Sequence, residues 1–197
     1  MERMDLDMLM IRLHACMAAG RYVEARRLLE QVLLEEPALG TAHGMMGWIL
    51  WALVNDHERA LMHFRNAVRW APGDVNTWMH YLNLLAANGL AEELHAAYGN
   101  ALQVPGIDRA QVHAAVARYL ERTGDRALAA ELYGRAAAAA LSTADERAFR
   151  EARLRPHLGR PRPPPCRAAF ASSAPTAASA PPASRFRPRG GSIRRQK

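Results

Sequence analysis

The sequence predicts an all-α protein in which helical hairpins of nearly equal length stack side by side as a solenoid. Two observations lead to this prediction. A set of turn, small and large apolar residues recurs at steps of 35, 34 and 35 residues. Between the turns, apolar residues recur every three to four positions, which is typical of amphipathic helices. A period of 20 to 50 residues indicates a solenoid because one hairpin cannot bury its apolar face alone.

Each predicted hairpin is marked by a turn residue, which is Gly20, Asn55, Gly89 or Gly124. In the second helix of a hairpin, small residues let backbones approach closely, and large apolar residues fill the gap to the next hairpin. The recurring positions are Ala25, Leu29, Val32 and Pro37, then Ala60, Phe64, Ala67 and Pro72, then Leu94, Tyr98 and Ala101, then Ala129, Tyr133 and Ala136.

These second helices resemble those of the tetratricopeptide repeat, in which small, aromatic and small residues precede a proline. The second hairpin matches from Ala60 to Pro72, and the fourth matches without the proline, from Ala129 to Ala136. The resemblance covers roughly residues 6–143. It implies a right-handed superhelical array of about four repeats, at 6–40, 41–74, 75–109 and 110–143.

Counting back from the turns also assigns the first helices. In the third repeat the family's bulky and small positions fall on Trp78, Tyr81, Leu82 and Leu85. In the second repeat the same count gives Gly44, Gly47, Trp48 and Trp51, so bulky and small residues are exchanged. Since a helical side chain leans over the preceding turn, we expect Trp48 to cover Gly44.

Helix caps are expected at the borders of these elements. Asp5, Thr41, Asp74 and Asp108 are predicted to cap first helices, and Asp56 and Asp125 to cap second helices. The segment 143–146 has the spacing of a capping box, with Thr143 as the cap, and opens a capping helix over 144–155.

The net charge of +7 originates in the C-terminal segment. Residues 1–155 contain 17 Arg against 19 acidic residues, a balance of −2. Residues 156–197 contain eight Arg, one Lys and no acidic residue, a balance of +9. Because this segment is rich in Pro, Ala and Arg and poor in large apolar residues, we expect a disordered basic tail.

In the tetratricopeptide family the first helices line the concave face of the array. The expected groove residues are Met10, His14, Met17, Met45, Ile49, Asn76, Met79, Asn83 and Arg118. Met10, Met45 and Met79 share one column and predict an apolar stripe, suited to an apolar segment or amphipathic helix of a partner. The alternative is that these methionines fill gaps between hairpins. Asn76 and Asn83 either bind a peptide backbone or are simply solvated.

The resulting interpretation is an adaptor that binds protein partners in its concave groove. One alternative is a chaperone for secreted or membrane-active bacterial proteins, similar to the helical-repeat chaperones of type III secretion. Another is association of the basic tail with nucleic acid or an anionic membrane. The two-carboxylate clamp of some family members is excluded because Lys197 is the only lysine.

No pattern typical of an enzyme, a cofactor site or a metal site was found. His57 and His63 are six residues apart and therefore lie on different faces of one helix. Glycine-rich phosphate loops and nucleophile elbows are missing. The acidic N-terminal residues 1–7 do not fit a signal peptide, so a cytoplasmic protein is expected. The Arg-rich composition suggests a GC-rich, bacterial coding sequence.

Overall fold

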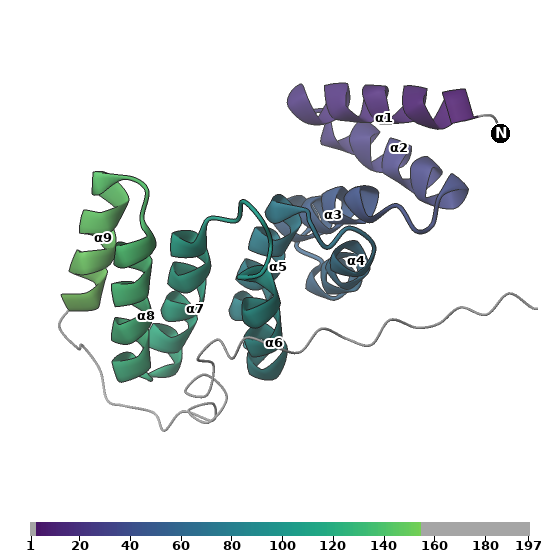
Figure 1. Cartoon of the computed structure of the whole chain (residues 1–197). Coiled ribbons are helices and arrows are strands. Elements are labelled where there is room, and N and C mark those ends of the chain that lie inside the picture. The colour runs from purple at the N-terminus through teal and green to yellow at the C-terminus, as the bar shows by residue number, and fades with distance from the viewer. Residues whose placement is uncertain (1–2, 155–197) are drawn as a thin grey trace, which may run out of the picture.

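The computed structural model describes residues 3–154 of the chain, with side chains from residue 6 onward. Within this range the chain forms nine α-helices, one π-helical segment and no strand (Figure 1). The elements are α1 (Arg3–Ala18), α2 (Tyr22–Glu35), α3 (Gly40–Ile49), η1 (Leu50–Val54), α4 (His57–Trp70), α5 (Val75–Asn88), α6 (Ala91–Ala101), α7 (Arg109–Thr123), α8 (Arg126–Ala139) and α9 (Thr143–Leu154). The all-α prediction is confirmed, and the expected tail at 156–197 lies outside the described residues.

The helices pack as successive pairs, α1 on α2, α3 on α4, α5 on α6 and α7 on α8, and α9 covers α8. Figure 1 shows α5 to α9 standing side by side, whereas α1 and α2 at the other end lie across that direction. The array therefore turns along its length. α3 contacts α5 and α5 contacts α7, whereas α1 joins the array mainly through α2.

The recurring positions of the sequence form the core between these helices. Ala25, Ala60, Leu94 and Ala129, one from each pair, are buried. The large positions Leu29, Phe64, Tyr98 and Tyr133 are buried as well. The alternation of small and large side chains along the second helices thus serves the close packing that the repeat predicts.

Four of the predicted caps are present. The carboxylates of Asp56, Asp74, Asp108 and Asp125 each accept a backbone N–H from the first turn of the following helix. Three caps were wrong. Asp5 lies inside α1, which begins at Arg3. Leu39 precedes α3, so Thr41 lies inside that helix and does not cap it. Before α9 the box belongs to Ser142, whose Oγ accepts the backbone N–H of Asp145 at 3.1 Å.

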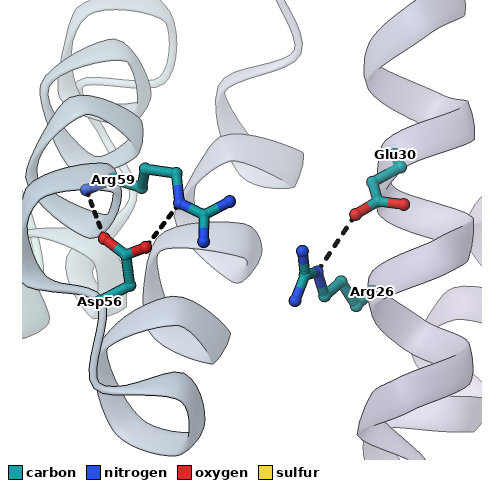
Figure 2. Close-up of polar contacts among 4 residues, drawn as sticks. All are labelled: Arg26, Glu30, Asp56 and Arg59. Atoms are coloured by element: carbon teal, nitrogen blue, oxygen red, sulfur yellow. Dashed lines mark hydrogen bonds and ion pairs between the residues drawn. The ribbon is translucent and has the colours of Figure 1, made fainter.

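Charged side chains near α2 and α4 are paired locally. Figure 2 shows the guanidinium groups of Arg26 and Arg59 facing each other, each held by a carboxylate of its own segment. Arg26 bonds Glu30 at 3.1 Å, and Arg59 bonds Asp56 at 2.5 Å. Exposed pairs one helical turn apart contribute little to stability, so these contacts do not hold the two hairpins together.

A different ion pair joins separate helices. Arg65 of α4 donates two hydrogen bonds to Glu93 of α6, both at 2.7 Å. The hydroxyl of Tyr81 on α5 donates to the same carboxylate. The hydrogen bonds from Arg65 hold the pKa of Glu93 below its usual value, and burial together with the bond to Glu93 raises the pKa of Tyr81. Three helices therefore meet at one carboxylate.

We expect Glu93→Gln to lower the free energy of unfolding by about 1–2 kcal/mol. The substitution removes the bidentate ion pair between Arg65 and Glu93, which solvent screens only in part. The matched change Glu30→Gln removes only a local exposed pair and is expected to cost less than about 0.5 kcal/mol. Urea unfolding followed by circular dichroism measures both values. Equal losses for the two variants would contradict the bridging role of Glu93.

Candidate functional site

The first helix of the second hairpin, formed by α3 and η1, is one residue longer than α5, the first helix of the third hairpin. At the turns after α1 and α5, the backbone N–H groups of Arg21 and Leu90 bond carbonyls five residues earlier. At the turn after α3, the N–H of Asp56 bonds the carbonyl of Leu50, six residues earlier, at 2.9 Å. The π-helical segment η1 holds this extra residue. Such wider turns are typical of a single inserted residue in a helix.

The extra residue changes the register of α3. His43 Nε2 donates to the carbonyl of Pro37 at 3.0 Å, and Trp78 Nε1 donates to the carbonyl of Pro72 at 2.7 Å. Both side chains lie six residues after the proline, so His43 corresponds to Trp78. The assignment of Gly44 to this position, which counted back from the turn, was therefore wrong by one residue.

The corrected register moves the groove-facing positions of α3. Ile49, expected in the groove, is only 2 % exposed and belongs to the core, so that expectation was wrong. Trp48 takes its place. In the corrected register, the position equivalent to Met79 is Gly44. Met45 and Met79 therefore no longer occupy equivalent positions in their repeats. The predicted methionine stripe is therefore interrupted at α3.

A pocket of about 440 Å³ opens where α1, α3 and α5 approach one another. Its walls combine three of the predicted groove residues with seven others. They are Met17, Met45 and Asn76, joined by Tyr22, Thr41, Gly44, Trp48, Asp74, Thr77 and His80. The pocket lies in the angle that the first hairpin makes with the next two, since α1 joins the array mainly through α2.

Aromatic rings form the walls of this pocket. The ring centroids of Tyr22 and Trp48 are 5.4 Å apart with planes inclined at 60°. The ring of His80 lies 6.5 Å from Trp48 and 6.0 Å from Trp51. Burial lowers the pKa of His80, although the nearby Asp74 carboxylate opposes this effect. The imidazole of His80 is therefore uncharged at neutral pH and adds an aromatic surface to the pocket.

The floor of the pocket depends on a close approach of α3 to α5. A Cβ atom on Gly44 would lie 2.3 Å from Thr77 Oγ1, which leaves no room for a side chain there. Thr77 Oγ1 donates to Asp74 Oδ2 at 2.6 Å, and the backbone N–H of Asn76 bonds Asp74 Oδ1 at 3.1 Å. These bonds fix the Asp74 carboxylate at the pocket wall.

The remaining predicted residues lie elsewhere on the first helices. His14 is exposed, and its Nδ1 lies 2.8 Å from the carbonyl oxygen of Met10 in the same helix. Met10 and Met79 are half-buried and pack against the core. Arg118 Nη2 of α7 lies 3.4 Å from Asn83 Oδ1 of α5. The pocket thus brings together three predicted residues, while Asn83 and Arg118 meet one repeat further along.

The residues that sequence reasoning missed are Tyr22, Trp48, Asp74 and His80. The spacing from Pro37 to His43 and from Pro72 to Trp78 is the signal that finds Trp48, because it fixes the register of α3 ahead of the extra residue. Behind α3, His43 and His63 form a hydrogen-bonded pair, with 2.9 Å between their Nδ1 atoms. Burial, with the nearby charges of His43 and Arg59, lowers the pKa of His63 to about 4.

Neither a protein-family model nor a curated protein matches this sequence. Solved structures do match. YrrB, described as a tetratricopeptide-repeat protein with an unusual peptide-binding site, aligns with a TM-score of 0.61 at 16 % identity over 71 % of each chain. The chain has the tetratricopeptide-repeat fold. PilF of Pseudomonas aeruginosa aligns at 0.58 and 16 % identity, over 68 % of this chain and 60 % of PilF.

A second tetratricopeptide-repeat protein, TTC0263 of Thermus thermophilus, aligns at 0.55 and 16 % identity over 72 % of this chain and 77 % of its own. At these identities the similarity concerns the tetratricopeptide-repeat fold alone. In the part of the chain that the structure describes, no helix has the length and apolar character needed to cross a membrane.

Proposed function

We propose that this tetratricopeptide-repeat chain is a non-catalytic, cytoplasmic adaptor that binds a peptide segment of a protein partner along its concave groove. Four repeats with the predicted borders form the binding surface, and α9 closes the array. The pocket between α1, α3 and α5 receives one side chain of the partner. The observation that supports this best is that Met17, Met45 and Asn76, expected in the groove from sequence, line one pocket of about 440 Å³.

The composition of the pocket suits a peptide. Concave, mostly apolar sites with a few fixed polar groups are typical of ligand sites in proteins. Met17 and Met45 offer flexible apolar contact, while Asn76 is exposed at the rim and presents an amide that is able to bond a peptide backbone. YrrB, which shares the fold, is described as having a peptide-binding site.

Site-specific photocrosslinking in cells tests this proposal. A benzoylphenylalanine residue at Asn76 is expected to crosslink a discrete partner, whereas the same residue at Leu34, which is 80 % exposed on α2, is not. Met45→Arg is expected to reduce the Asn76 crosslink at least about tenfold, because its long side chain fills the pocket and excludes the partner's side chain.

Two results would contradict the groove proposal. Equal crosslinking from Asn76 and Leu34 would show that the partner does not select the concave face. Partner binding that survives Met45→Arg, depends steeply on salt and is lost when residues 156–197 are deleted would assign binding to the basic segment instead.

A further inference from the structure

The pocket between α1, α3 and α5 has two features that an apolar peptide side chain does not need. The first is its aromatic wall. Tyr22 and Trp48 both line the pocket, and their rings are inclined at 60° with centroids 5.4 Å apart, so they do not stack in parallel on each other. The face of an aromatic ring carries negative electrostatic potential and attracts cations, tryptophan most strongly.

The second feature is the Asp74 carboxylate. Among the ten residues that line the pocket, Asp74 is the only acidic one, and none is Lys or Arg. Asp74 accepts hydrogen bonds from two neutral donors, the hydroxyl of Thr77 and the backbone N–H of Asn76. Arg21, next to Tyr22 in sequence, forms an ion pair with Glu24 at 3.1 Å. The N-terminus of α5 stabilises this carboxylate, but no cationic side chain among the lining residues is paired with it.

We propose that this pocket binds a cationic side chain, specifically an arginine presented by a basic peptide segment of the partner. The inference rests on the proposed groove function and specifies its ligand. The planar guanidinium stacks on the faces of Tyr22 and Trp48 and donates to Asp74, a combination that a compact ammonium group matches less well. Met17 and Met45 contact the aliphatic stem of the arginine.

An apolar side chain in the same pocket is the alternative occupant, and the charge argues against it. A leucine or phenylalanine would displace water from the Asp74 carboxylate without supplying a cation. Such desolvation of an ionised group is costly. An arginine removes the same water but provides the opposite charge and additional hydrogen bonds.

Three matched peptides test the inference on the full chain. They are acetyl-Ala-Ala-Arg-Ala-Ala-amide and the same peptide with citrulline or leucine at the centre. Citrulline keeps the shape of arginine without its charge. Binding is followed by the shift of the Trp48 indole N–H in NMR spectra, assigned with the Trp48→Phe variant. We expect the arginine peptide to bind about tenfold more tightly than either neutral peptide.

Variants at the pocket identify the groups responsible. Asp74→Asn keeps a capping side chain on α5 and is expected to remove most of the preference for arginine over citrulline. Asp108→Asn makes the same change at the cap of α7, away from the pocket, and is expected to leave the preference intact. Tyr22→Leu is expected to weaken the arginine peptide more than the leucine peptide. Circular dichroism verifies that each variant is folded.

The possible outcomes separate the two proposals. Leucine binding as tightly as arginine, or citrulline doing so, overturns the cation assignment while leaving peptide binding in the groove supported. Absence of a saturable Trp48 shift with the arginine peptide at millimolar concentration also overturns it. The proposed function is judged separately by the Asn76 crosslink, which does not depend on these peptides.

Discussion

Replacing Phe64 with alanine is expected to lower the free energy of unfolding by about 3–5 kcal/mol, the usual cost of deleting a fully buried aromatic ring. Phe64 is 0 % exposed. Its ring lies 6.2 Å from that of Tyr81 and 6.4 Å from that of His80, measured between centroids. A Cβ on Gly47 would lie 3.0 Å from its Cδ1 atom. One side chain thus fills the space between α3, α4 and α5.

Urea unfolding of Phe64→Ala and of Met62→Ala measures this effect. Met62 is on the same helix and is 50 % exposed, so its truncation is expected to cost less than about 1 kcal/mol. Phe64→Leu, which keeps most of the volume, is expected to fall between the two. A loss for Phe64→Ala no larger than that for Met62→Ala would mean that the second and third hairpins are not packed through this ring.

The importance of Phe64 was evident from sequence because the second helices of the hairpins carry no inserted residue. Their small and aromatic positions keep a constant distance from the preceding turn, so one count places all of them. The same count failed in α3, where the turn at Asn55 lies after the extra residue held by η1. Every first-helix position of that hairpin was therefore displaced by one, which put Ile49 in the groove instead of Trp48.

A helix tolerates one inserted residue by widening a turn, and the hydrophobic pattern of a short helix does not reveal where this occurs. The proline before the helix is a better anchor, because the His43 and Trp78 side chains bond the proline carbonyls at the same spacing. The pocket itself could not be predicted from the sequence. It depends on how far α1 stands from α3, and no residue pattern in either helix specifies that distance.

The Gly40→Ala change is expected to destabilise the protein by about 2–3 kcal/mol, although alanine is a better helix former than glycine by about 1 kcal/mol. Gly40 begins α3 and lies against the end of α4. A Cβ there would lie 2.6 Å from the backbone nitrogen and the Cβ of Ala71, and 2.9 Å from the carbonyl carbon of Trp70. Because backbone atoms cannot turn aside as a flexible side chain does, the two helices must separate.

Gly99→Ala provides the matched control, since Gly99 also lies within a helix but a Cβ there would meet no atom within 4 Å. It is expected to raise the free energy of unfolding by about 0.5–1 kcal/mol. Both substitutions replace a helical glycine with alanine, so the gain in helix propensity is similar. If the two changes in unfolding free energy have opposite signs, the difference reports the contact of α3 with the end of α4. If Gly40→Ala also proved stabilising, α3 would be free to move away from Ala71. The contact of Gly40 with Ala71 would then not fix the start of α3, and so would not help to place Trp48 in the pocket.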